Sequence, residues 1–299
     1  MGKICVIIST YNGSKYLDEL LCSVCNQTYV DLEIWARDDG STDETKNILE
    51  KYSGEKFKWI CDGDNLGPAT SFLKALKTAP QADYYAFCDQ DDVWDQDKLS
   101  SAISMIENCN DYDCSRPIMY YSNVEVVDEK LSHIKLSDYN VPFNDLNYTL
   151  FHSTAAGCTI VMNRKLRDLL NQYMPSYISM HDSWTHKVCL ALNGIVLFDK
   201  KAHIKYRQHQ NNQVGFENNK LSFAQGFGSP ICQSSKSAQE ILKGYGPMLD
   251  QKARRSIECV ANYTTNFHEK FRLLTDKSFY SDSFLTNLRE HISVLRNRR

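Results

Sequence analysis

Three aspartates follow an apolar stretch within a few residues of one another. The segment FCDQDDVW, residues 87–94, places Asp89, Asp91 and Asp92 directly behind large hydrophobic side chains. Carboxylates this close repel one another, so such a cluster is usually a solvated turn or a site where a divalent cation neutralises the charge. The choice depends on which other polar residues the fold brings beside the cluster.

The first half of the chain alternates predicted strands and helices. Apolar, β-branched runs predict buried strands at residues 3–10, 32–37, 56–62 and 84–90. Helices are predicted between them, at residues 14–27, 41–52 and 68–77. The second helix opens with Ser41 and Glu44 at capping-box spacing, and the third with Pro68 in its first turn. This alternation predicts an α/β fold with a parallel sheet and helices on both faces.

The second half has a mixed pattern. Strands are predicted at residues 118–128, 157–163 and 195–199, and helices at residues 164–173 and 181–192. The pattern changes again near Phe216, after which a loop-like stretch is followed by predicted helices to the end of the chain.

Each of the first four predicted strands has distinctive polar residues at its carboxyl end. These are Ser9, Thr10, Tyr11 and Asn12, then Asp38 and Asp39, then Asp62, Asp64 and Asn65, and finally Asp89, Asp91 and Asp92. Ligands of open α/β sheets bind at this edge, so the four groups together predict a site. An edge rich in carboxylates and poor in Lys and Arg binds a phosphate only through a divalent cation, Mg²⁺ or Mn²⁺. The chain contains neither GxGxxG after the first strand nor GxxxxGK[ST].

Asp38 and Asp39 have two interpretations. A carboxylate at the end of the second strand can accept the imide N–H of uracil or thymine. Alternatively, either residue forms an Asx-turn that leads into the helix from Ser41.

Composition narrows the class of protein. The 299 residues carry a net charge of −3, which excludes nucleic-acid binding by global attraction. Residues 250–299 hold 10 Lys and Arg against 6 Asp and Glu. This basic excess has two interpretations, contact with an anionic membrane or acceptor, or an ordinary solvated helical surface. Scattered cysteines, no signal-peptide pattern and no long apolar run predict a cytoplasmic protein.

Four segments together resemble glycosyltransferase family 2, which has the GT-A fold. They are STYNG (9–13), RDDGSTD (37–43), DNLG (64–67) and DQDDVW (89–94), in the order and spacing of that family. The resemblance covers roughly residues 3–215. It implies a GT-A domain at 1–215, with a nucleotide-binding half at about 1–115 and an acceptor half at about 116–215, and it leaves 216–299 as a C-terminal helical extension. It also implies transfer of one sugar from a nucleotide diphosphate donor, with inversion at the anomeric carbon.

The resemblance assigns roles to residues at the sheet edge. Asp89-Gln90-Asp91 resembles the DxD motif of the family, which implies that Asp91 binds the cation. Asp89 is then expected near the ribose or a metal-bound water. The base and ribose are expected to contact residues of the first two strand ends, namely Thr10, Tyr11, Asn12, Asp38 and Asp39.

Two later segments complete the resemblance. In HDSWTH, 181–186, Asp182 takes the position of the catalytic base, and His181 replaces the usual glutamate, as in a rhamnosyltransferase-like bacterial branch. The alternatives are a helix N-cap for Asp182 and His181 as the base. In YRQHQNNQVG, 206–215, Arg207 is expected to pair with phosphate, and His209 to ligate the metal or hydrogen-bond phosphate, or else to be structural.

Two rival functions remain at this stage. A nucleotidyltransferase also uses a nucleotide-binding sheet and a cation, but usually has a glycine-rich basic loop that STYNGSKYLD lacks. A non-catalytic sugar-nucleotide-binding protein would not need both Asp91 and Asp182.

The resemblance suggests dTDP-rhamnose as the donor, with a UDP-hexose as the alternative. The expected acceptor is a saccharide, free or linked to a lipid diphosphate at the cytoplasmic face of the membrane, in polysaccharide biosynthesis.

Overall fold

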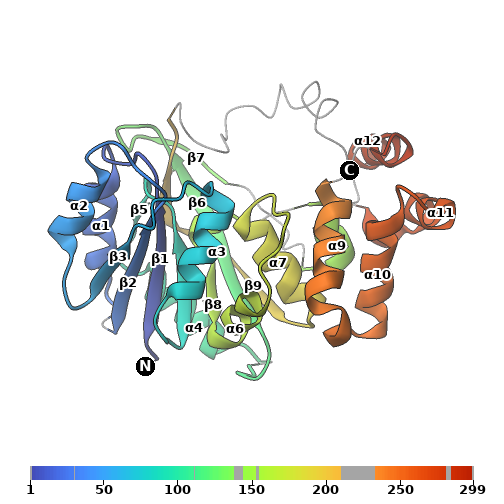
Figure 1. The fold of residues 1–299 in the computed structure, drawn as a ribbon, viewed down its shortest axis with the longest axis horizontal. Coiled ribbons are helices and arrows are strands. Elements are labelled where there is room, and N and C mark those ends of the chain that lie inside the picture. The colour runs from blue at the N-terminus through green and yellow to red at the C-terminus, as the bar shows by residue number, and fades with distance from the viewer. Residues whose placement is uncertain are drawn as a thin grey trace.

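The computed structural model describes residues 2–29, 31–110, 112–137, 144–152, 155–209, 233–280 and 284–297. Within them, one nine-stranded sheet runs through the molecule (Figure 1). The strands are β1 (Ile4–Thr10), β2 (Leu32–Asp38), β3 (Phe57–Ile60), β4 (Tyr84–Cys88), β5 (Val93–Trp94), β6 (Ile118–Val127), β7 (His133–Leu136), β8 (Val161–Asn163) and β9 (Ile195–Arg207).

The nucleotide-side half of the sheet is parallel, as predicted. Strands β3, β2, β1 and β4 are neighbours in that order. Thr10 pairs with Asp38 and Ile8 with Cys88, so the carboxyl ends of β1, β2 and β4 lie at one edge. Alternate residues of β1 pack into two different hydrophobic cores, one on each face of the sheet. This two-sided burial is why the strand reads as a continuous apolar run.

The other half of the sheet is mixed. Strand β8 is antiparallel to β4 and β6, whereas β9 is parallel to β6 and antiparallel to β5. The predicted short strand at 195–199 extends to Arg207, because the long β6 pairs with β9 across two register shifts. The predicted strand at 157–163 begins instead as a 3₁₀ turn at Gly157–Thr159, and only Val161–Asn163 is extended.

Helices cover both faces. They are α1 (Leu17–Cys25), α2 (Thr45–Tyr52), α3 (Pro68–Thr78), α4 (Lys98–Glu107), α5 (Leu146–Phe151), α6 (Arg164–Gln172), α7 (His181–Ala191), α9 (Gln233–Tyr245), α10 (Gln251–Asn262), α11 (Phe267–Thr275) and α12 (Phe284–Leu295). The capping-box prediction is wrong, because α2 begins after Glu44 and the Ser41 hydroxyl donates to Asp38 instead. Strands β5 and β7 and helices α4 and α5 had not been predicted.

The C-terminal helices pack on the same core as the sheet. Ile241 of α9 and Ile257 of α10 are fully buried in one cluster with Phe72 of α3 and Trp184 of α7. In Figure 1, α9 and α10 stand beside α7, at the end of the molecule opposite β3. Among the described residues, no helix combines the length and apolar character that a membrane span requires.

Candidate active site

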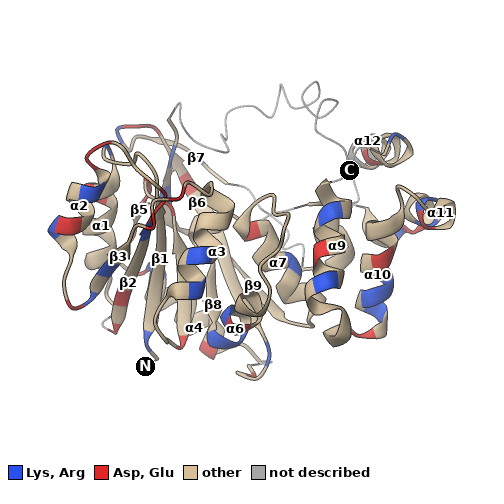
Figure 2. Ribbon diagram, viewed as in Figure 1, with Lys and Arg blue, Asp and Glu red and all other residues tan. Residues whose placement is uncertain are grey.

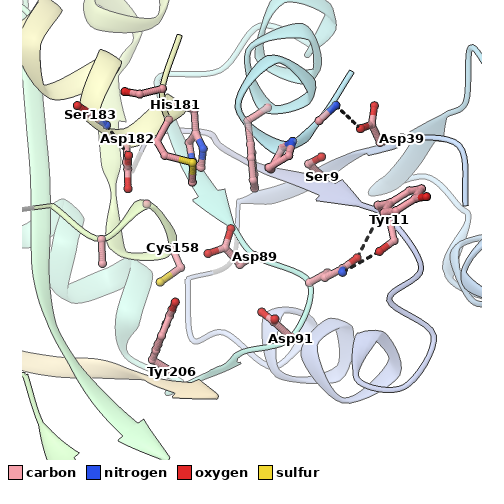
Figure 3. A pocket seen from close by; sticks show the side chains of 18 of the residues that line it. Ser9, Tyr11, Asp39, Asp89, Asp91, Cys158, His181, Asp182, Ser183 and Tyr206 are labelled. Atoms are coloured by element: carbon pink, nitrogen blue, oxygen red, sulfur yellow. Dashed lines mark hydrogen bonds between the residues drawn. The ribbon is translucent and has the colours of Figure 1, made fainter. Parts of the chain in front are cut away.

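A cavity of about 1070 Å³ opens beyond the carboxyl ends of β1 and β4. Residues of the β1 and β4 ends line one side of it, and residues from the start of α7 and the first turns of α9 line another. Figure 3 shows Asp89 between Asp91 and Asp182, with all three side chains around one space. The structure therefore brings together three carboxylates from two segments that lie far apart in the sequence.

The STYNG segment forms the turn after β1. The Tyr11 amide donates to Gln90 Oε1 at 2.9 Å, and Gln90 Nε2 donates to the Tyr11 carbonyl at 3.0 Å, which fastens this turn to the loop after β4. Asn12 adopts a positive φ of 47°, and its Oδ1 accepts from the Thr42 amide. The Tyr11 ring is 47% exposed, and Tyr11 and Asn12 both line the cavity. Both predicted nucleotide-binding residues thus lie at the cavity.

Thr10 and Asp38 lie behind the cavity wall. Both are fully buried, and the Thr10 hydroxyl donates to Asp38 Oδ1 at 3.1 Å. Asp38 also accepts from the Ser41 amide and hydroxyl, as in the Asx-turn interpretation. The expectation that Thr10 and Asp38 contact the nucleotide directly is therefore corrected, because in this structure they brace the turns that shape the wall.

Asp39 lies at the cavity within a charge network. Its carboxylate accepts from the amides of Leu66 and Gly67, both at 2.9 Å, and pairs with Arg37. Arg37 is fully buried and also pairs with Asp62, which a second cation, Lys74, approaches at 2.5 Å. Lys74 and Arg37 hold the pKa of Asp62 well below its usual range. Arg37 and Lys74 therefore neutralise the carboxylates at the ends of β2 and β3. This differs from the expectation that the sheet edge is poor in Lys and Arg.

Asp91 and His209 form the best-placed pair for a cation. His209 Nε2 lies 2.8 Å from Asp91 Oδ2, and both residues line the cavity. Ligand atoms at adjacent corners of an octahedron with bonds near 2.1 Å lie about 3 Å apart, so this pair fits one Mg²⁺ or Mn²⁺. Carboxylate oxygen and imidazole nitrogen also suit Mn²⁺ chemically. The prediction from the sequence placed these two residues together, and the structure does so.

Asp89 is the acidic neighbour of this pair. Burial and the Asp91 and Asp182 carboxylates raise its pKa to about 8. A bound cation would lower that pKa, because it favours the ionised form. Three mutually repelling carboxylates at one cavity are therefore consistent with a cationic partner.

A second group of ligand-type atoms lies deeper. The side chains of Asp89, Asp92 and Cys158 come within 4.8 Å of one another. Asp92 and Cys158 are buried, and the ammonium of Lys98 lies under this group, 3.5 Å from the centre of the Trp94 ring. A thiol and a resident lysine cation suit Mg²⁺ or Mn²⁺ poorly, so this group fits the ion less well than Asp91 and His209 do.

Arg207 differs from its prediction. Its guanidinium donates to the carbonyls of Asp91 (2.8 Å) and Glu129 (2.7 Å), pairs with Glu19, and lies over the Tyr16 ring. The side chain is 2% exposed, and Arg207 is absent from the described residues that line the cavity. The expected phosphate contact is thus corrected to a structural contact, in which Arg207 supports the backbone of Asp91.

Asp182 lies in the first turn of α7 and lines the cavity. The N-cap of this helix is Met180 and makes no side-chain capping bond, so the N-cap interpretation of Asp182 is wrong. Its carboxylate accepts from the Ser183 amide, and burial raises its pKa to about 6 against the favourable bonds from the Ser183 and Gly157 amides. A carboxylate with this pKa is mostly ionised at neutral pH and basic enough to accept a proton.

His181 packs against aromatic side chains beside Asp182. Its ring stacks on Phe72, with centroids 4.0 Å apart, and meets Phe87 edge-on. The residue is 2% exposed, and burial lowers its pKa to about 3. Gly157 leaves room for this ring, because a Cβ there would lie 2.7 Å from His181 Nε2.

Several residues at the cavity were not singled out from the sequence. Gln90, Lys187, Tyr206 and two serines of α9, Ser234 and Ser237, all line it. Gln90 lies between the two aspartates of the DxD-like segment, so its position in the sequence could have indicated that it lines the cavity. Lys187 and the α9 serines carry no local signal, because only packing between distant helices brings them to the cavity.

Comparison with known proteins decides the family. The sequence profile described as Glycosyl transferase family 2 matches residues 5–170. The chain belongs to glycosyltransferase family 2. It is 32% identical over 224 residues to the dTDP-rhamnosyl transferase RfbG of Shigella flexneri, covering 70% of this chain and 73% of that protein. It is also 35% identical to a putative teichuronic acid biosynthesis glycosyltransferase, TuaG of Bacillus subtilis, over 34% of this chain and 41% of that protein.

Solved structures agree on the fold. The Staphylococcus aureus TarS 1–349 complex with UDP-GlcNAc superposes with a TM-score of 0.57 at 20% identity, covering 98% of this chain and 79% of that one. A Pyrobaculum calidifontis mannosyltransferase in complex with GDP-Man and Mn²⁺ gives 0.54 at 15% identity, over 100% and 88%. The GT-A fold and the assignment as a glycosyltransferase are confirmed, and the nucleotidyltransferase alternative finds no support.

Proposed function

We propose that this glycosyltransferase moves one sugar from a nucleotide diphosphate donor to a saccharide hydroxyl, with inversion, during cell-surface polysaccharide synthesis. The observation that carries the proposal is the placement of Asp89 and Asp91 opposite Asp182 around one cavity. A donor diphosphate beside Asp91 and an acceptor hydroxyl beside Asp182 would meet between them.

The donor would occupy the sheet edge. Tyr11 offers an exposed ring for the base, and Asn12 and Asp39 offer polar groups for the base and ribose. Asp91 and His209 would hold a divalent cation, which when bound stabilises charge on the leaving diphosphate. Asp89 is suited to the ribose or to a water bound by that cation.

Asp182 would act as the general base. It takes the proton of the acceptor hydroxyl as that oxygen attacks the anomeric carbon from the face opposite the leaving group. General base catalysis of this kind contributes roughly 10²–10⁴-fold. Asp182 is better suited than His181, whose ring contacts two phenylalanines and whose buried nitrogens have no hydrogen-bond partner among the described residues.

The donor proposed first is dTDP-rhamnose, with a UDP-hexose as the alternative. The Shigella flexneri relative is named a dTDP-rhamnosyl transferase, which favours the first. The proposed acceptor is a saccharide, free or linked to a lipid diphosphate.

The C-terminal helices are proposed to contact the membrane face where such an acceptor resides. On α11, Phe267 and Phe271 are 76% and 59% exposed, one helical turn apart. Figure 2 shows basic and acidic residues interspersed along α10 and α11, so their opposite charges partly cancel. The exposed phenylalanines are therefore proposed to contribute apolar contact with the membrane in addition to charge. Replacing both phenylalanines with serine should reduce co-sedimentation with anionic vesicles, and unchanged co-sedimentation would refute this contact. The basic charge of residues 250–299 includes Arg254 and Arg255 on α10, and also Arg298 and Arg299, which lie outside the described residues.

The decisive experiment is a thermal stability screen against dTDP, UDP, GDP and ADP, with and without Mn²⁺. Wild type is compared with Asp91→Asn and with Asp64→Asn, a matched control in which the lost carboxylate lies at the same edge, 62% exposed and outside the cavity lining. A ligand at 100 times its Kd should stabilise the fold by about 2.7 kcal/mol. We expect Mn²⁺-dependent stabilisation by one pyrimidine diphosphate in wild type and Asp64→Asn, and none in Asp91→Asn. Stabilisation that is indifferent to Mn²⁺, or retained in Asp91→Asn, would contradict the proposed cation site.

A further inference from the structure

The part of the cavity lined by α7 and α9 presents side-chain polar atoms that are not paired with any group of the described residues. Ser183 and Lys187 lie on α7, one turn apart, and Ser234 and Ser237 lie on the first turns of α9. All four line the cavity and are between 4% and 8% exposed. Among the described residues, their side-chain hydroxyls and ammonium make no hydrogen bond or ion pair.

Such a lining indicates a polar ligand. These side chains are nearly buried in the protein but open onto the cavity, so their hydroxyls and ammonium are available to a molecule that occupies it. A nearly buried ammonium is costly unless a counter-charge accompanies it. Burial lowers the pKa of Lys187 to about 8, and the Asp182 carboxylate opposes that effect, so the side chain is still mainly cationic at pH 7. A ligand that supplied an oxyanion to Lys187 and hydroxyls to the three serines would satisfy all four groups.

The carboxylates of the sheet edge and Lys187 lie on different elements around the cavity. Asp39, Asp89 and Asp91 lie at the sheet edge, where the proposed donor diphosphate would bind with its cation. Lys187 lies on the helix that carries Asp182. Helical side chains lean toward the amino terminus, so its ammonium extends toward the turn of Asp182. A ligand held there would lie against the proposed base, which is the position of the acceptor.

Helix α9 is held firmly enough to form one wall of such a subsite. The Glu240 carboxylate, 2% exposed, accepts from the Tyr173 hydroxyl at 2.8 Å, the Ser176 amide at 2.6 Å and the Ser176 hydroxyl at 2.9 Å. Gly244 allows close contact with the Tyr173 ring, since a Cβ there would lie 2.4 Å from ring carbon Cδ1. These contacts fix α9 against the segment that leads into α7.

We propose that Lys187, with Ser183, Ser234 and Ser237, forms an acceptor subsite for a saccharide that carries an oxyanion. This inference rests on the proposed function and deepens it by naming the acceptor class. The oxyanion is the carboxylate of a sugar acid or a phosphate attached to the sugar, because both present oxygens to an ammonium in the same way.

The test is binding of three small saccharides to the full chain with Mn²⁺ and the stabilising nucleoside diphosphate, measured by ligand-observed NMR titration. The probes are methyl β-D-glucuronide, glucose 1-phosphate and neutral methyl β-D-glucoside. We expect at least one anionic probe to bind about tenfold or more tightly than the neutral one. The stronger of the two anionic probes identifies a carboxylate or a phosphate as the source of the charge.

Substitutions test whether Lys187 causes the tighter binding of the anionic probes. Lys187→Met should abolish the difference between charged and neutral probes, whereas Lys187→Arg should retain it. Lys15→Met is the matched control, because Lys15 also lines the cavity but is exposed and paired with Glu129 at 2.7 Å; it should keep the preference. If Lys187→Met does not fold, Lys187→Gln takes its place.

Two results would overturn the inference. One is equal binding of charged and neutral probes to the wild type, which needs no variant to interpret. The other is a charge preference that persists without Lys187. Either result, together with intact Mn²⁺-dependent nucleotide binding, refutes the acceptor subsite alone, whereas loss of nucleotide binding in wild type refutes the proposed function.

Discussion

Replacing Asp182 with asparagine should make the protein more stable while it loses activity. The carboxylate is largely buried, and burial raises its pKa from 3.8 to about 6. A raised pKa means that the folded state resists ionisation of this group. The isosteric amide keeps an oxygen for the Ser183 and Gly157 amides but carries no charge. The native aspartate is therefore a source of instability that its catalytic role would explain.

The size and sign of the effect follow from linkage. The folded-state pKa exceeds the unfolded-state pKa by about two, which corresponds to a gain of about 3 kcal/mol in the free energy of unfolding at neutral pH. This value is an upper limit, because the variant also removes the Asp182 charge that favours the ammonium of Lys187. Below about pH 3 the wild-type carboxyl is protonated in both states, so the variant gains nothing. As pH rises to about 6, the unfolded state releases its proton first, and the wild type loses the stability that the variant keeps.

Denaturant unfolding of both proteins at pH 3 and pH 7.5 measures this gain directly. We expect equal stability at the lower pH and a more stable variant at the higher pH, with turnover reduced roughly 10²–10⁴-fold. A variant that is less stable at pH 7.5, or that gains the same amount at both pH values, would refute the assignment of a buried, ionised Asp182.

Three further substitutions test the supporting contacts. Gly157→Ala should destabilise the fold by about 1–3 kcal/mol and lower kcat by displacing His181, whereas Gly54→Ala, with no atom within 4 Å of its added Cβ, should be nearly neutral in thermal melts. Arg207→Met should weaken Mn²⁺ binding about 10–100-fold, because the guanidinium holds the Asp91 carbonyl; isothermal titration that shows unchanged affinity would refute this role. Glu240→Gln should cost about 1–3 kcal/mol of stability by leaving one donor of its cluster unsatisfied, and an unchanged melting temperature would contradict it.

The sequence alone determined the parallel half of the sheet and the residues at its edge. Uninterrupted apolar runs predict strands buried on both faces, and the carboxyl ends of parallel strands must meet, so Tyr11, Asp39, Asp89 and Asp91 were placed together correctly. The GT-A fold was implied by the resemblance of four short segments to glycosyltransferase family 2, and the comparisons confirmed it.

Only the tertiary structure decided which polar residues face the cavity. Asp38 and Asp39 are neighbours in sequence, yet packing buries the first with Thr10 and leaves the second at the cavity wall. Arg207 lies close to His209 in the sequence but turns to the backbone of Asp91. Lys187 and the serines of α9 line the same cavity because α7 and α9 pack on one core, although the two helices lie far apart in the sequence. Burial and pairing of a side chain are set by contacts between segments distant along the chain, which local patterns do not record.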